Sequence, residues 1–398
     1  MIADEAVPIS HRLGGGARTA SGWTTSVLGT RELQGLSPAA WDELSRRSLV
    51  ANPFYERPYL LAGIGTVDRW PIRAVVVRCP SGRLVGLFPF ETVLPGPLSL
   101  RRGARNLYQF NGTPLIDVEA APFVVRSFLA WLAGVGCGRL WIMPDIDFGS
   151  PLTRLIEQEA AGRSFVTSRA RPYRRSVLTP MDKGLDAHLT SVLSKSRLKD
   201  LKRNLRRLEE RGNVAFERAE APALLDERLE HFLALEASGW KGKAGTAFLS
   251  REKHAAFARR AFGGMVRETG RLVIDSLLLD GRPLAISLNI VGGADIAFTP
   301  KCAFDEDWRT YSPGLLLEYF VIKAFHEHQR FAAMDSATTK EGHVIADMWN
   351  GSIEMGDLII RSHSLAGNML EGMVRTHERA RRLAKRVRDE WRGRRRNG

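Results

Sequence analysis

The chain has 398 residues, of which 44% are hydrophobic and 26% charged, and a formal net charge of +14. This composition is typical of a soluble globular protein and leaves room for two domains with proper cores. The first 21 residues lack the apolar run of a signal peptide, and the longest apolar stretch, near 128–138, is too short to span a bilayer. Three scattered cysteines without CxxC spacing favour a reducing compartment and argue against a structural zinc, so we expect a cytoplasmic protein.

The first half of the chain has the pattern of a mixed α/β domain. After a loose leader, residues 38–48 predict a short helix with Ser37 as its N-cap. The following elements are two strands, a strand region around Asn111-Gly112, an apolar helix and a buried strand, at residues 71–79, 83–93, 106–117, 121–134 and 139–143. The periodicity lapses between residues 171 and 184, which marks a domain junction.

The second half repeats roughly this order of elements, although no residue-level repeat is visible. A basic helix at 194–211 carries leucines on one stripe, and two further helices follow. Three strand-like runs are then joined by turns at Asp280-Gly281 and Gly292-Gly293, the dipeptides that supply positive φ. The predicted helices, strands and tail are residues 223–237, 250–268, 313–328, 330–335, a last strand pair within 351–362, and an amphipathic tail helix.

The helix start at Ser312-Pro313-Gly314 is the most informative feature of the sequence. Ser, Pro and Gly in a first helical turn leave several backbone N–H groups free and unobstructed, which suits a pyrophosphate. The alternative is that Pro at the first position merely starts a helix, as it does routinely. The preceding three-stranded meander favours the phosphate site.

Four motifs of this half recur in one known family. They are Trp240-Lys241-Gly242 with Gly245-Thr246-Ala247, Lys301-x-Ala303-Phe304-Asp305, the Ser312-Pro313-Gly314 helix start, and the strand that ends in Asp335. Together they resemble the BioF-type acetyltransferase domain of the GNAT superfamily, which includes proteins named for cellulose biosynthesis. Residues 35–180 resemble the family through weaker features, and two tandem halves also resemble the Fem-type aminoacyltransferases. The chain departs from the family after Asp335, where it continues Ser-Ala-Thr-Thr-Lys-Glu-Gly-His without a glycine-rich stretch.

The resemblance implies an α/β (α+β) protein made of two tandem GNAT-like domains. Each would be a mixed, mostly antiparallel sheet flanked by helices. The expected divisions are a loose leader at 1–34, an acceptor-shaping domain without cofactor at 35–180, an acetyl-CoA-binding domain at 181–365, and a basic tail at 366–398. The implied reaction is acetyl transfer from acetyl-CoA to an amine or hydroxyl, with a sugar or lipid-linked precursor of an exported polysaccharide as the expected acceptor.

In this fold the pantetheine arm of the donor lies between two splayed strands, here residues 294–301 and 330–335. The backbone amides around Pro313, from Ser312, Gly314 and Leu315, would face the pyrophosphate, and Arg309 would add charge at the rim.

Acyl transfer also needs a base for the nucleophile and an acid for the thiolate. Asp335 is the preferred base because it ends a buried strand, and Glu306 and Asp305 are its rivals. Tyr311 is the candidate acid.

The glycine-flanked loop at residues 238–246 is expected over the acceptor site. Trp240 would stack on a sugar ring there and Lys241 would bind a phosphate or carboxylate, while Lys301 and Asp305 of the shared motif are assigned to the substrate side. We predict no metal site, because His326 and His328 do not share a helix face. Cys302 has no His partner at visible spacing for a thiol mechanism.

Nearly all of the net charge comes from two segments. Residues 195–211 hold eight Lys/Arg against three acids, and residues 375–398 hold eleven against three, a net of +8. A solvated charged face is the default reading, and a peripheral contact with an anionic membrane surface is the next. Nucleic acid is disfavoured because no recognition motif accompanies the arginines, and tRNA enters only under the Fem-type alternative. The third class is a non-catalytic GNAT shell that acts as a membrane-associated scaffold.

Overall fold

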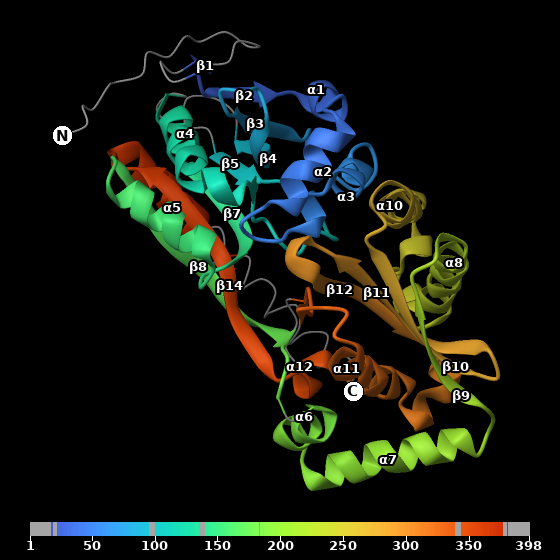
Figure 1. The fold of residues 1–398 in the computed structure, drawn as a ribbon. Coiled ribbons are helices and arrows are strands. Elements are labelled where there is room, and N and C mark those ends of the chain that lie inside the picture. The colour runs from blue at the N-terminus through green and yellow to red at the C-terminus, as the bar shows by residue number, and fades with distance from the viewer. Residues whose placement is uncertain are drawn as a thin grey trace.

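The computed structural model of the chain describes residues 17–18, 22–94, 100–134, 140–182, 184–338, 344–376 and 380 (Figure 1). Its strands are β1 (Ala17–Arg18), β2 (Thr24–Leu28), β3 (Arg73–Arg78), β4 (Leu84–Leu94), β5 (Leu100–Gly103), β6 (Leu115–Ile116), β7 (Leu140–Asp147), β8 (Phe165–Leu178), β9 (Val214–Ala219), β10 (Leu272–Leu279), β11 (Arg282–Val291), β12 (Ile296–Phe304), β13 (Ala333–Asp335) and β14 (Gly351–Ser362). Its α-helices are α1 (Thr30–Gln34), α2 (Pro38–Arg46), α3 (Arg57–Gly63), α4 (Ala121–Gly134), α5 (Pro151–Ala161), α6 (Gly184–Val192), α7 (Lys195–Glu209), α8 (Pro222–Ser238), α9 (Trp240–Lys243), α10 (Glu252–Gly264), α11 (Pro313–His328) and α12 (Val344–Met348).

Among the described residues, the strands form one sheet whose order is nearly symmetric about its centre. Read inwards, the order is β2-β3-β4-β5-β7 on one side, where the two-residue β1 forms the outer edge, and β9-β10-β11-β12-β13 on the other. Each arm is antiparallel until its last step, where β5 pairs in parallel with β7 and β12 in parallel with β13. The helix between the parallel partners is α4 in the first arm and α11 in the second. The two-fold repeat of topology predicted from the sequence is confirmed.

The centre of the sheet is built by strands that cross between the halves. β14, from the end of the chain, lies between β7 and β8, while β8 pairs on its other edge with β13 (Figure 1). A boundary at residue 180 therefore does not separate two sheets, because part of the predicted second domain completes the sheet of the first. The leader also ends earlier than expected. β2 pairs with β3, and Leu33 of α1 is wholly buried, so residues 24–34 belong to the first arm.

The two halves also share one hydrophobic core. Phe54 of the first half packs edge to face with Phe298 of the second half. Tyr59 of the first half packs in the same way with Phe257 and Phe262 of the second half. This core lies on the α8 and α10 side of β10–β12. α11 covers the opposite side, where its apolar residues join Val273, Leu277 and Ala297.

Two local predictions need correction. The Asp280-Gly281 hairpin forms as expected, with both residues at positive φ. At the next turn, however, the positive φ values belong to Ala294 and Asp295 and not to Gly292-Gly293. The predicted strand at residues 106–117 is mostly a loop that ends in the short strand β6.

The two basic segments differ in how their apolar residues are used. α7 begins at Ser194, whose hydroxyl accepts a hydrogen bond from the Arg197 amide, and its stripe is buried at Leu201 and Leu208. Its Lys and Arg side chains are exposed. The predicted tail is described only to residue 376 and at Ala380, with a helix over 365–376. In the described part of the chain, no helix has both the length and the apolar character that crossing a membrane would take.

Candidate active site

The strands β12 and β13 part in the way that a donor gap requires. They pair in parallel only between Ile296–Phe298 and Ala333–Asp335, after which β13 ends and β12 runs on to Phe304. The amide of Asp305 donates to the carbonyl oxygen of Leu284 on β11, so alternate residues of β12 face β11 and the carbonyl of Cys302 faces the opposite edge. Within the described residues, no strand pairs with that edge beyond Phe298.

A bulge in β12 lies beside the fork. The register with β11 slips between Leu288 and Ile290, which inserts an extra residue near Thr299 and Pro300. Bulges bend a strand and re-aim its groups, and they are frequent next to active sites. The bulge follows directly after Phe298, the last residue of β12 that pairs with β13, so the irregularity coincides with the place where the gap begins.

The turn predicted to hold phosphate lies at the far end of this edge. Ser312 has φ +56°, and Pro313 takes the first position of α11. The amides of Gly314 and Leu315 occupy the first turn, where no intrahelical acceptor exists. The Ser312 amide departs from the prediction, because it donates to the carbonyl oxygen of Arg309 within the preceding 3-10 turn (Glu306–Tyr311). Arg309 is exposed at the rim, as expected.

Sequence reasoning missed that α7 borders this turn. Asn204 donates to the Ser312 hydroxyl at 3.3 Å, and the Arg207 guanidinium lies 5.2 Å from the centre of the Tyr311 ring. The Nε of Arg211, just after α7, donates to the Tyr311 hydroxyl at 2.9 Å. The basic helix is therefore part of the surroundings of the phosphate turn.

Asp335 lies at the fork. The residue is only 6% exposed, and its side chain accepts a hydrogen bond from the Ala337 amide at 2.7 Å. The Arg175 guanidinium lies 3.6 Å away and comes from β8 in the first half. Burial raises the pKa of Asp335, and the charge of Arg175 opposes that rise. Residues of both halves therefore contact the candidate base and influence its pKa.

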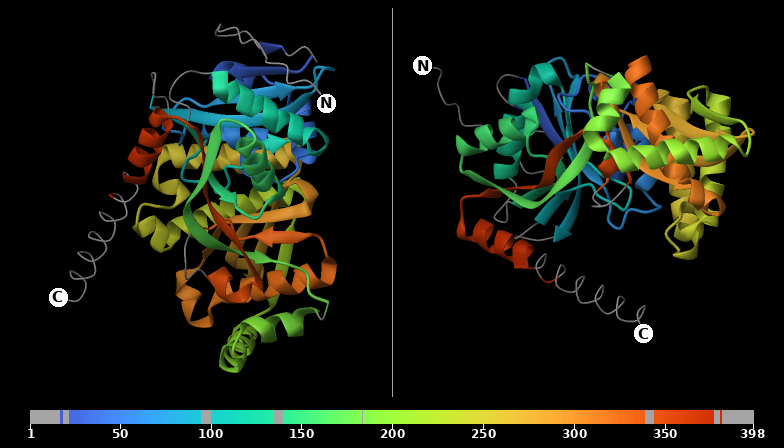
Figure 2. Two further views of the ribbon diagram at one scale, coloured as in Figure 1. Left: turned by 90° about the vertical axis from the view of Figure 1, so that its left-hand side faces the viewer. Right: turned by 90° about the horizontal axis from the view of Figure 1, so that it is seen from below.

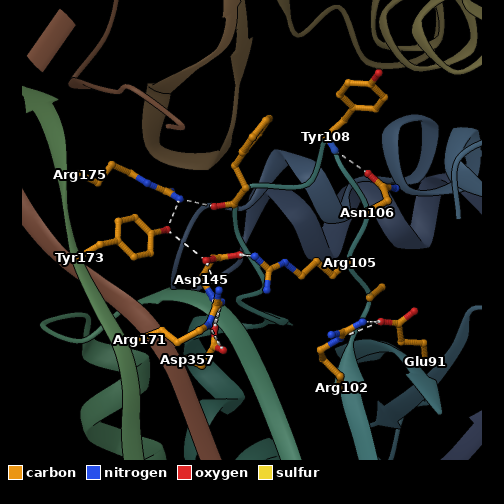
Figure 3. A network of polar contacts seen from close by, with 12 residues as sticks. Glu91, Arg102, Arg105, Asn106, Tyr108, Asp145, Arg171, Tyr173, Arg175 and Asp357 are labelled. Atoms are coloured by element: carbon orange, nitrogen blue, oxygen red, sulfur yellow. Dashed lines mark hydrogen bonds and ion pairs between the residues drawn. The ribbon is translucent and has the colours of Figure 1, made fainter. Parts of the chain in front are cut away.

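Arg175 heads a buried polar network that the sequence did not reveal (Figure 3). Its Nη2 donates to the carbonyl oxygen of Phe110 at 2.5 Å and to the Tyr173 hydroxyl at 2.8 Å, whereas Nε and Nη1 have no hydrogen-bond partner among the described residues. Tyr173 in turn donates to Asp145 at 3.3 Å, and Arg105 pairs with the same carboxylate at 3.1 Å. The sequence carries a signal in its arginines at positions 169, 171, 174 and 175, which overlap the start of the predicted domain junction at 171–184.

The same network lies where two central strands are irregular. Asp145 and Arg171 both have positive φ, each beside a proline, and the register of β14 against both β7 and β8 slips near Asp357. Arg171 makes two hydrogen bonds to the Asp357 carboxylate, at 2.6 and 2.5 Å. Such local strain persists only where the surroundings enforce it, and it concentrates at functional sites.

The predicted acceptor loop lies against the open edge of β12. Lys241 donates to the carbonyl oxygen of Cys302 at 2.7 Å, on the edge where a pantetheine arm would pair. Glu236 joins the two predicted lysines, with its Oε1 atom 2.8 Å from Lys301 Nζ and 3.6 Å from Lys241 Nζ. Burial lowers the pKa of Lys301, and Glu236 opposes this effect. Trp240, which precedes Lys241 in this loop, is 50% exposed.

The other predicted residues are not brought to the fork. Glu306 accepts hydrogen bonds from the Trp240 amide and from Lys243, which lowers its pKa, and so it holds the loop in place. Asp305 caps the 3-10 turn and pairs with Arg282 at 2.6 Å. Tyr311 ends the 3-10 turn that follows β12, and its hydroxyl accepts a hydrogen bond from Arg211. Glu306 is thus engaged with the α9 loop, and Tyr311 with the residue that follows α7.

The corresponding gap of the first half is filled. After β5 the loop 104–113 lies against β7, and a Cβ at Gly112 would be 2.2 Å from the Pro144 carbonyl oxygen. The Asn52 side chain fixes this loop by donating to the carbonyl oxygens of Asn111 and Thr113. Among the described residues, no three His, Cys, Asp or Glu side chains are grouped to hold a metal ion.

Comparisons with known proteins agree with this geometry. Residues 195–343 match the family model described as Acetyltransferase (GNAT) domain. The crystal structure of FemX resembles the chain with a TM-score of 0.53 at 12% identity, over 84% of this chain and 98% of FemX. A conserved protein of unknown function from Bacteroides thetaiotaomicron VPI-5482 does so with a TM-score of 0.51 at 12% identity, over 82% of this chain and 97% of that protein. No curated protein matches the chain at a significant level. Residues 195–343 thus belong to the GNAT superfamily, within a fold that most of the chain shares with FemX.

Proposed function

We propose that the protein transfers an acetyl group from acetyl-CoA to an amine or hydroxyl of a sugar or lipid-linked precursor of a cell-envelope or exported polysaccharide. The observation that carries the proposal is the edge of β12 beyond Phe298, with which no strand of the described residues pairs and which runs from the buried Asp335 carboxyl towards the first turn of α11. An edge of this kind offers a pantetheine arm the backbone pairing that a further strand would have.

The donor would be held along this edge. The amides of Gly314 and Leu315 suit the pyrophosphate, since helix N-termini favour anions, and Arg309 adds charge at the rim. The pantetheine arm would pair with the edge carbonyls of β12, which requires Lys241 to leave the Cys302 carbonyl or to bind the arm itself. The thioester then lies at the fork, next to Asp335.

The chemistry follows from the placement of Asp335. The acceptor amine or hydroxyl attacks the thioester carbon, its proton passes to the Asp335 carboxylate, and the CoA thiolate leaves when the tetrahedral intermediate collapses. The Trp240 ring and the Lys241 ammonium border the edge from the α8 side, where a sugar with a phosphate or carboxylate would be recognised by stacking and charge.

One observation favours a second donor class, a charged tRNA. The exposed cations of α7 border the phosphate turn through Arg207 and Arg211, and they extend the positive charge well beyond the reach of a single pyrophosphate. The fold shared with FemX is compatible with this donor but carries no information on it.

Titration calorimetry with acetyl-CoA separates these classes. Wild-type protein should bind, and Gly314→Val should weaken binding at least tenfold because it adds a branched side chain to the turn whose amides would hold the pyrophosphate. Gly372→Val is the matched control, since a side chain at Gly372 would meet no neighbouring atom and lies on another helix. If the wild type binds charged tRNA and not acetyl-CoA, the donor assignment is wrong; if it binds neither, the shell acts as a scaffold.

A further inference from the structure

The helix over residues 365–376 presents an apolar face to solvent. Leu365, Met369 and Met373 are 84%, 64% and 57% exposed. Their spacing of four residues places them in one row along the helix. Single exposed apolar side chains need no explanation, but an aligned row of three marks an interaction surface. Figure 2 shows this helix, in red, on the outside of the molecule.

The opposite face of the helix is anchored on the sheet, so the exposed row has a fixed direction. Leu370 is buried against Leu140, Ile142, Ala170 and Ile359 of the β7–β14–β8 surface, and Val374 packs beside it. Glu371 accepts hydrogen bonds from the Ser168 hydroxyl at 2.7 Å and from Arg361 at 2.5 Å. Residues 365, 369 and 373 therefore cannot turn inwards without breaking these contacts.

The net charge of the residues around this row is positive. Glu371 is the sole acid between residues 363 and 376, and it is neutralised by Arg361 and Arg375. The residues that follow continue this bias, with a net charge of +8 over 375–398. A second copy of the chain is a poor occupant, because a dimer through this face would bring two such segments together.

We propose that the row of Leu365, Met369 and Met373, together with the basic residues that follow it, docks the protein on an anionic membrane surface. Apolar side chains enter the boundary between headgroups and acyl chains while cations remain among the acidic headgroups. α7 has no apolar side chains of its stripe available for a membrane at Leu201 and Leu208, because both are buried in the protein's own core. Of the two basic segments, the C-terminal one is the membrane contact.

Co-sedimentation with large unilamellar vesicles tests this proposal without any substrate of the proposed reaction. Wild-type protein should bind vesicles of phosphatidylcholine with 30% phosphatidylglycerol and should bind pure phosphatidylcholine at least tenfold more weakly. Raising the salt from 0.1 to 0.5 M should weaken binding to the anionic vesicles several-fold. The triple variant Leu365→Ser/Met369→Ser/Met373→Ser should lose at least tenfold in affinity.

Two control variants keep the result interpretable. Leu107→Ser/Val118→Ser removes exposed apolar side chains elsewhere and should leave vesicle binding within about twofold of wild type, as should Lys202→Ser/Arg203→Ser on α7. Near-native thermal unfolding of the triple variant excludes loss of fold. Equal binding to both lipid mixtures, or undiminished binding of the triple variant, overturns the proposal. So does a wild-type dimer in light scattering that the triple variant converts to a monomer, because the row would then belong to a second copy.

Discussion

The Asp335 carboxyl is subject to two opposing influences whose balance decides whether it can serve as a base. Burial at the end of β13 raises its pKa, and the Arg175 charge at 3.6 Å lowers it. A general base works best when its pKa lies near the working pH, because it must be ionised and still attract a proton. Arg175 reaches Asp335 from β8, so a residue of the first half would tune chemistry in the second.

Replacing the base gives the most direct residue-scale prediction. Asp335→Asn should lower kcat about 10²–10⁴-fold, the usual contribution of general base catalysis, with the KM for acetyl-CoA nearly unchanged. Release of the CoA thiol, measured with a thiol reagent, follows the reaction. Glu306→Gln is the matched control and should keep turnover within a few-fold, because the Glu306 carboxylate is already bonded to the Trp240 amide and to Lys243 of the α9 loop. The opposite pattern of the two variants would make Glu306 the base.

Replacing Arg175 should shift the pH–rate profile. Arg175 lowers the pKa of Asp335, so its removal should raise that pKa and move the acidic limb of kcat against pH to higher pH. Arg175→Lys, which keeps the positive charge, should move the limb less than Arg175→Gln. The Gln variant leaves Asp335 buried and unpaired and should also lose about 3 kcal/mol of stability. A purely structural role of Arg175 would change stability and leave the pH profile of the Gln variant where it is.

At the scale of elements, α11 serves both the phosphate turn and the core beneath it. Its buried face carries Glu318, which accepts a hydrogen bond from the Trp349 indole. Below it, a ladder of buried polar side chains crosses the sheet, from Arg218 to Asp275 to Asn289 to Thr299. The ladder ends at the bulge of β12, so the packing under α11 holds the strand that opens the donor gap.

Glu318 predicts how stability depends on pH. Burial raises its pKa to about 7, which is above the value in the unfolded chain. The protonated form therefore adds stability that is complete below pH ~4.5 and is lost as the pH rises through 7. Glu318→Gln keeps the acceptor for Trp349 and should gain roughly 1–3 kcal/mol relative to wild type between pH 5 and 8.

Urea unfolding at the two pH values measures this difference, with the exposed Glu327→Gln on the same helix as its control. Part of the pH dependence should remain in the Glu318 variant, because burial also raises the pKa of Glu56 to about 7. Equal slopes for Glu318→Gln and Glu327→Gln would mean that Glu318 is not protonated in the folded protein at neutral pH.

The sequence predicted those elements whose signals are local. The α11 start, the Asp280-Gly281 hairpin and the stripe of α7 each follow from neighbouring residues. β8 did not, because Pro172 in its middle removes a backbone donor and suggests a break. The structure tolerates it since Arg171 takes a positive φ and Arg171 and Pro172 together lie opposite the single residue Gly356, which makes a bulge in β8. The pairing of Arg175 with Asp335 joins residues 160 positions apart, and no local pattern reports such a contact.

The whole molecule is organised by the exchange of strands at its centre. β14 closes the gap between β7 and β8, and Gly356 is required there because a Cβ would lie 2.6 Å from the Ala170 carbonyl oxygen. The Arg171–Asp357 pair and the neighbouring Asp145 link all three strands at this level. Together with the aromatic core that both halves share, this arrangement leaves neither half with a complete sheet of its own.

We therefore expect the two halves to unfold as one cooperative unit. Calorimetry of the full chain should give a single transition whose calorimetric and van't Hoff enthalpies agree. Asp357→Ala breaks a part-buried ion pair at the centre and should lower the midpoint by a few degrees without splitting the transition. Acetyl-CoA stabilises the cooperative unit that contains its binding site. If both halves form that unit, acetyl-CoA should raise the midpoint of the entire transition. Two transitions, of which acetyl-CoA moves only one, would show that the halves are independent despite the exchanged strands.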